Sequence, residues 1–195
     1  MIVGLVRSKS GNVFLNQNDI TNLPMYKRAR LGLGYLPQEP SIFKKLNVEE
    51  NIRILLELIQ PIAPDQFETR INELIMELGL DHVRYSKGYQ LSGGEKRRVE
   101  IARTLALNPS FILLDEPFAG VDPIAVSEIQ KIIIKLKERG LGIIISDHNV
   151  QETLSITDRS YIIHQGEILL SGTANEIAVD EKARKYYLGD SFKLA

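Results

Sequence analysis

Phe111-Ile112-Leu113-Leu114-Asp115-Glu116-Pro117 is the stretch of this chain that decides the fold. Four consecutive apolar residues between turn residues are typical of a strand that is buried on both faces, as in a parallel sheet. A basic helical pattern ends upstream at Asn108-Pro109, and an amphipathic helical pattern follows over 123–139. Gly140 closes that helix before another apolar strand over 141–146. Helix and strand alternate, so the sequence predicts an α/β fold around a parallel sheet.

Further elements are predicted on both sides of this core. Apolar residues alternate with spacings of three and four over 48–60 and over 65–78, which predicts two helices separated by Pro61 and Pro64. This pair reads as a helical insert. The other predicted elements are strands over 12–16 and 31–36, a short helix over 150–156, a hairpin of strands 160–164 and 167–171, and a helix over 175–188.

Composition excludes several classes of function. The 195 residues include 24 basic and 25 acidic side chains, so no net field favours nucleic acid or an anionic membrane. No nucleic-acid partner is therefore expected. The chain has no cysteine, which excludes disulfides and thiolate metal sites. Its apolar runs are far shorter than the roughly 20 residues that span a bilayer.

Leu91-Ser92-Gly93-Gly94-Glu95 opens the basic helix and has the features of an anion site. Ser92 can cap the helix and Glu95 can complete a capping box. Gly93 and Gly94 let a phosphate approach backbone N–H groups at the positive end of the helix dipole. A well-capped helix without a ligand is the simpler interpretation of Ser-x-x-Glu taken alone.

Polar residues also follow the predicted strands. Asp115 and Glu116 stand where α/β sheets place ligands, and they suit a hydrated magnesium ion and an activated water. His148 lies just beyond the strand over 141–146, and Gln38 just beyond the strand over 31–36. Taken alone, the carboxylate pair is explained equally well by solvated groups, a loop histidine is more often only a surface residue, and Gln38 is less specific still. Four such signals at one edge of one sheet make a stronger case for a ligand site than any one of them.

In this order and spacing, the segments resemble the ATP-binding-cassette (ABC) family of transporter ATPases. The matching motifs are Gln38 (Q-loop), Leu91 to Glu95 (signature), Phe111 to Glu116 (Walker B), Gly120-Val121-Asp122 (D-loop) and His148 (H-loop). Within the family, residues 34–43, 118–123 and 147–150 resemble the ATPases of bacterial lipopolysaccharide export.

The resemblance implies one ABC ATPase domain over 1–195, with a P-loop NTPase-like (RecA-like) core and a helical subdomain at about 47–94. It implies ATP and Mg²⁺ as ligands, with Asp115 and Gln38 on the metal, Glu116 on the attacking water and His148 on the γ-phosphate. It also implies a homodimer, in which each signature contacts the ATP of the other subunit. The residues that this assigns to nucleotide binding or to the interface are Ser92, Gly93, Gly94, Glu95 and Asp122.

The same resemblance implies membrane transporter subunits that dock near Gln38 and the helical insert, on the cytoplasmic face of the bacterial inner membrane. The expected activity is ATP hydrolysis that drives lipopolysaccharide export. The alternatives are an amino-acid or sugar importer, a docking module without catalysis, and a soluble cassette protein of translation or DNA repair. Proteins of the last class usually carry two cassettes or a long coiled coil, and neither occurs here.

One motif of the family does not occur. A P-loop reads Gly-x-x-x-x-Gly-Lys before Ser or Thr, and none of the 14 glycines here precedes a lysine. From this we expect an N-terminally truncated chain that lacks the first strands and the P-loop, with Met1 to Val6 as the end of the P-loop helix. Such a chain would bind ATP weakly, would not hydrolyse it alone and would expose apolar surface. The sequence assigns no role to the tail over 190–195.

Overall fold

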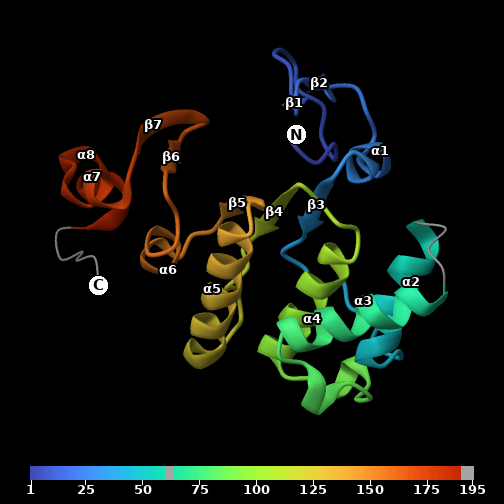
Figure 1. Ribbon diagram of the computed structural model, residues 1–195. Helices are drawn as coiled ribbons and strands as arrows, with labels where there is room; N and C mark the ends of the chain where they lie inside the picture. Colours follow the sequence, from blue (N-terminus) through green and yellow to red (C-terminus); the bar gives the residue numbers. More distant parts are fainter. Residues whose placement is uncertain (60–63, 190–195) are drawn as a thin grey trace. The chain divides into compact units, whose positions relative to one another are not determined.

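The computed structural model describes residues 1–59 and 64–189, and the chain divides into two compact units, Met1–Ser146 and Asp147–Ala195 (Figure 1). The single domain predicted over 1–195 stays a prediction, as does the helical subdomain at about 47–94. The tail over 190–195 lies outside the described residues.

A parallel sheet forms the centre of the first unit. Its strands are β3 (Leu33–Leu36), β4 (Phe111–Asp115) and β5 (Gly142–Ser146), and β4 pairs with both of the others (Figure 1). Ile112 and Leu114 on β4 are buried. The predicted α/β fold with a parallel sheet is therefore confirmed.

Two long helices adjoin this sheet. Helix α4 (Gly93–Leu105) contacts β3, and helix α5 (Pro123–Glu138) contacts β5. The helix predicted over 123–139 matches α5 to within one residue, and the predicted basic helix is confirmed as α4, which ends shortly before Asn108-Pro109. The left-handed Gly140 (φ +86°) ends α5, since a residue without a Cβ adopts this conformation easily.

The first 30 residues differ from the prediction. The predicted strand over 12–16 is a small hairpin of β1 (Phe14–Leu15) and β2 (Asn18–Asp19), and α1 (Met25–Arg30) was not predicted. The helical prediction for residues 1–6 is wrong, because these residues form turns. Gly4 has φ +86°, and the buried Arg28 guanidinium binds the carbonyls of Met1 and Ile2 that a helix would use internally.

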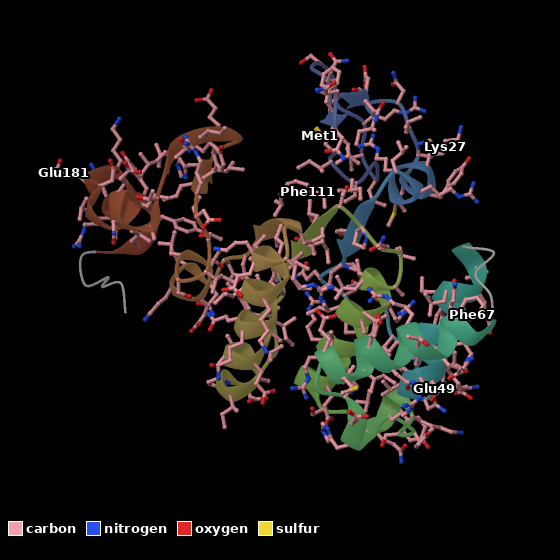
Figure 2. All side chains as sticks on the ribbon, viewed as in Figure 1. Met1, Lys27, Glu49, Phe67, Phe111 and Glu181 are labelled. Atoms are coloured by element: carbon pink, nitrogen blue, oxygen red, sulfur yellow. The ribbon has the colours of Figure 1, made fainter. Side chains whose placement is uncertain are left out.

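The helical insert contains α2 (Val48–Ile59), α3 (Pro64–Glu77) and the 3₁₀ turns η1 (Asp81–Val83) and η2 (Gly88–Gln90). Both predicted helices are confirmed, although Gln60 and Pro61 lie outside the described residues. Glu49, labelled in Figure 2, accepts hydrogen bonds from Arg53 at 2.7 Å and from Arg84 at 2.7 Å. Arg53 also donates to Glu68 at 2.6 Å, so this ionic network joins α2 to α3.

The second unit contains α6 (Val150–Leu154) and the predicted hairpin of β6 (Ser160–His164) and β7 (Glu167–Gly172). The single helix predicted over 175–188 is wrong. Three pieces replace it, namely α7 (Ala174–Val179), α8 (Glu181–Ala183) and the π-helical turn η3 (Arg184–Leu188). Asp180 is extended (ψ 129°) and its carboxylate accepts from the Ala183 N–H at 2.8 Å, which ends one helix and caps the next.

Candidate functional site

Asp115 ends the central strand, and side chains of both neighbouring strands hold its carboxylate. One oxygen accepts from the Ser146 hydroxyl at 2.6 Å and the other from the Tyr35 hydroxyl at 3.2 Å. Burial raises the pKa of Tyr35, and the nearby Asp115 charge raises it further, so the phenol stays protonated as a donor. The predicted carboxylate at the carboxyl edge of the sheet is thus fixed in orientation.

Glu116 follows in a left-handed conformation, with φ +43°. Its backbone N–H donates to the Ser146 carbonyl at 2.7 Å, and its carboxylate accepts from the Gln38 side-chain amide at 2.8 Å. The structure therefore brings Gln38, Asp115 and Glu116 together at one edge of the sheet, as the strand ends predicted. The direct bond between Gln38 and Glu116 was not predicted.

The oxygen donors here fit a magnesium ion bound jointly by protein and phosphate. Within residues 1–59 and 64–189, no group of three or more His, Asp or Glu side chains could hold a metal alone. Mg²⁺ usually takes one or two protein ligands and completes its shell with water and phosphate oxygens. Asp115 supplies a carboxylate, and the amide nitrogen of Gln38 makes the bond to Glu116, so that bond does not engage its amide oxygen.

The predicted capping box at the start of α4 is confirmed. Ser92 accepts from the Glu95 N–H at 3.3 Å, and the Glu95 carboxylate accepts from the Ser92 N–H at 2.8 Å. His82 lies 3.0 Å from the other Glu95 oxygen. Burial would raise the pKa of Glu95, but these hydrogen bonds outweigh it and hold the pKa below its usual 4.5.

The two glycines of this segment differ in their surroundings. A Cβ on the buried Gly94 would lie 2.5 Å from the Cβ of Ala125, so the glycine lets α4 pack closely on α5. Gly93 is exposed, and a Cβ added there would have the Gly120 carbonyl oxygen as its nearest neighbour, at 3.3 Å. The sequence did not reveal this packing reason for Gly94, and phosphate binding by both glycines stays a prediction.

Asp122 has a local structural role. Its carboxylate accepts from the Ala125 N–H at 3.0 Å and caps α5, with Pro123 at the first helical position. A place at a subunit interface remains a prediction for this residue.

His148 belongs to the second unit, so its predicted role on the γ-phosphate stays a prediction. Its side chain is 73% exposed, and its Nδ1 atom lies 3.8 Å from the Asp147 carboxylate.

Arg97 is the residue that sequence reasoning missed. The sequence predicts it only as part of a basic helix, but it is only 6% exposed. Its guanidinium donates to backbone carbonyls on two segments and to the Glu100 carboxylate. Its spacing from Glu100, three residues along α4, is the sequence signal that was available.

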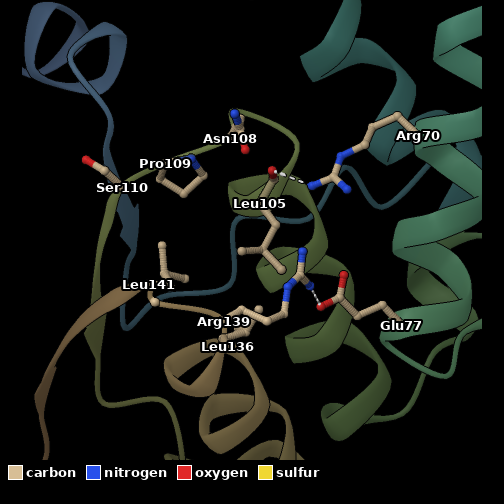
Figure 3. Close-up of a pocket in the computed structure, with 10 residues that line it drawn as sticks. Arg70, Glu77, Leu105, Asn108, Pro109, Ser110, Leu136, Arg139 and Leu141 are labelled. Carbon is tan, nitrogen blue, oxygen red and sulfur yellow. Dashed lines mark hydrogen bonds and ion pairs between the residues drawn. The ribbon is translucent and has the colours of Figure 1, made fainter.

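A pocket of about 200 Å³ lies at the other edge of the sheet, where β4 and β5 begin (Figure 3). Arg139 pairs there with Glu77, and Arg70 donates to the Leu105 carbonyl at 3.4 Å. These contacts join the helical insert to the core, at the opposite strand ends from Asp115 and Glu116.

None of the helices in the described ranges is both long and apolar enough to cross a bilayer.

Comparisons with known proteins all find ATP-binding subunits of ABC transporters. The model of the ABC transporter family matches residues 1–119. The chain is 54% identical over 194 residues to the lipopolysaccharide export system ATP-binding protein LptB of Acidithiobacillus ferridurans, and 52% identical to LptB of Escherichia coli K12. Each alignment covers 100% of this chain and 80% of the relative.

Among solved structures, the chain is similar to the ADP conformation of MJ1267, an ATP-binding cassette of an ABC transporter. The TM-score is 0.83 at 27% sequence identity, and the match covers 97% of this chain and 81% of that one.

Proposed function

The chain belongs to the ABC transporter family, and from this premise we propose that it is the ATP-hydrolysing subunit of a bacterial lipopolysaccharide exporter. The single observation that supports lipopolysaccharide as the transported substrate is the 54% identity to LptB across all of this chain. The proposed ATP hydrolysis is supported by the arrangement of Gln38, Asp115 and Glu116 at one edge of the sheet.

In this function each residue at the sheet edge has a separate role in ATP hydrolysis. Asp115, oriented by Tyr35 and Ser146, would hold Mg²⁺ together with the amide oxygen of Gln38. Bound Mg²⁺ neutralises charge on the phosphate oxygens during phosphoryl transfer. The Glu116 carboxylate accepts a hydrogen bond from the attacking water and orients it. His148 donates a hydrogen bond to the γ-phosphate.

The proposal extends to an assembly. Two copies form a dimer in which Ser92, Gly93, Gly94 and Glu95 of one contact the nucleotide of the other, with Asp122 near the interface. Membrane subunits dock near Gln38 and the helical subdomain at about 47–94, which places the protein on the cytoplasmic face of the inner membrane. Residues 1–195 belong to one ATPase domain in this arrangement. Because they contain no P-loop motif, they are not expected to hydrolyse ATP by themselves.

The test uses the protein purified from its own cells with the membrane proteins that accompany it. Rebuilt into vesicles, the complex is expected to hydrolyse ATP in the presence of Mg²⁺ and to move lipopolysaccharide to an acceptor outside. Glu116→Gln should reduce both activities to a small residual rate while leaving the complex assembled. If the Glu116→Gln variant hydrolyses ATP at the wild-type rate, the proposed role of Glu116 is wrong. Stimulation by an amino acid or a sugar instead of lipopolysaccharide would identify an importer.

A further inference from the structure

The backbone at Glu116 is in a conformation that its own sequence disfavours. Its φ of +43° is left-handed, where a residue with a Cβ is crowded, and a residue before proline is biased toward extended backbone. A residue remains in such a conformation only where its surroundings fix it. The Ser146 carbonyl binds the Glu116 N–H on one side, at 2.7 Å. The carbonyls of this turn, from Asp115 to Pro117, need hydrogen-bond donors of their own.

The guanidinium of Arg97 holds these carbonyls. Its Nη2 atom donates to the carbonyls of Asp115 at 2.8 Å and Glu116 at 2.9 Å, and its Nε atom donates to the Pro117 carbonyl at 3.2 Å. Three successive carbonyls of one tight turn therefore converge on a single side chain. That turn carries both carboxylates of the site.

The other side of the same guanidinium reaches the Gln38 loop. Its Nη1 atom donates to the Pro37 carbonyl at 2.8 Å and to the Glu100 carboxylate at 3.2 Å. Glu100 in turn accepts from the Ser41 N–H at 2.5 Å. The residues on both sides of the loop are thus fixed to helix α4, while Gln38 itself binds the Glu116 carboxylate.

The count of hydrogen bonds distinguishes arginine from lysine at this position. An arginine has five N–H donors in a rigid fork, and all five have an acceptor here. A lysine keeps the positive charge but has three donors on one atom, so it cannot serve both segments.

We propose that Arg97 is a positioning residue for ATP hydrolysis. Its guanidinium holds Glu116 in the left-handed conformation that directs the carboxylate toward Gln38, and it links this turn to the Gln38 loop. The inference rests on the proposed role of Glu116 in hydrolysis. Arg97 acts through the backbone of Glu116 and does not touch the reacting atoms.

The test compares Arg97→Lys and Arg97→Met with the wild type in the complex purified from its own cells. We expect kcat to fall on the order of 100-fold in both variants, because a small misplacement of a catalytic group has effects of this size. KM for ATP should be unchanged, since nucleotide contacts remain. Arg139→Lys, which alters an arginine at the other edge of the sheet, should keep the wild-type rate. Hydrogen exchange at the Glu116 amide should accelerate in the Arg97 variants only.

A second comparison separates positioning from general stability. In a Glu116→Gln background, Arg97→Lys should cause no further loss of turnover, because the group that Arg97 positions is already gone. A further loss there, or a wild-type kcat in a folded Arg97→Lys variant, would overturn the inference alone. Full activity of Glu116→Gln itself would instead overturn the proposed role of Glu116. If Arg97→Met does not fold, Arg97→Lys decides the question.

Discussion

At the scale of the residue, the carboxylate of Asp122 has a local role that can be separated from an interface role. It caps α5 by accepting from the Ala125 N–H. We expect Asp122→Ala to lower the free energy of unfolding by about 1 kcal/mol, because the cap is lost, and Asp122→Asn to change it little. Urea unfolding of both variants measures this. Equal stability of the two would show that the cap contributes nothing.

Glu95 gives the protein a specific dependence on pH. Burial opposes its ionisation, but the hydrogen bonds from Ser92 and His82 dominate and lower its pKa from 4.5. A depressed folded-state pKa stabilises the protein above the unfolded value and loses this effect as pH falls through the folded value. The advantage of the wild type over Glu95→Gln should therefore be present at neutral pH and disappear in acid. Thermal unfolding of both proteins from pH 7 downward tests this. An advantage that persists in acid would contradict the ionic explanation.

The ends of the predicted strands indicated that Gln38, Asp115 and Glu116 lie at one edge of the sheet, but individual hydrogen bonds could be predicted only between residues close together in the sequence. The capping box joins Ser92 and Glu95, three residues apart, so spacing alone revealed it. The bonds of Arg97 to Pro37 and of Tyr35 to Asp115 span 60 and 80 positions. No local pattern encodes such pairs, since they depend on which strands become neighbours in the folded sheet.

At the scale of the element, the contact between α4 and α5 depends on the missing side chain of Gly94. We expect Gly94→Ala to destabilise the protein by about 1 to 3 kcal/mol, because the new Cβ would lie 2.5 Å from that of Ala125. Combining it with Ala125→Gly should recover part of the loss. Chemical denaturation of the single and double variants measures the coupling. Additive losses would mean that the two helices do not meet at these positions.

Elements with strong periodicity were predicted well, whereas those set by a distant contact or by a helix cap inside an apolar pattern were not. Helices α2, α3 and α5 bury one regular apolar face, and β4 is a continuous apolar run. The turns of residues 1–6 depend instead on Arg28, which lies more than 20 positions away. The division of the predicted helix over 175–188 depends on the backbone of Asp180, where the carboxylate begins a new helix.

At the scale of the whole molecule, acidic and basic groups balance. With 24 basic and 25 acidic side chains, we expect no retention on immobilised heparin or DNA at an ionic strength of about 0.15 M. Column chromatography of the purified protein measures this. Salt-reversible retention would reveal a local basic surface and a polyanionic partner.

The left-handed Glu116 also sets stability and activity against each other. Glycine adopts this backbone without crowding, so Glu116→Gly should melt at a higher temperature than the wild type while losing hydrolysis. A library of random variants sorted for heat resistance alone should therefore enrich glycine at position 116, and the same library sorted for growth should eliminate it. Opposite enrichment in the two screens would mark a position where evolution has kept a strained residue for its chemistry.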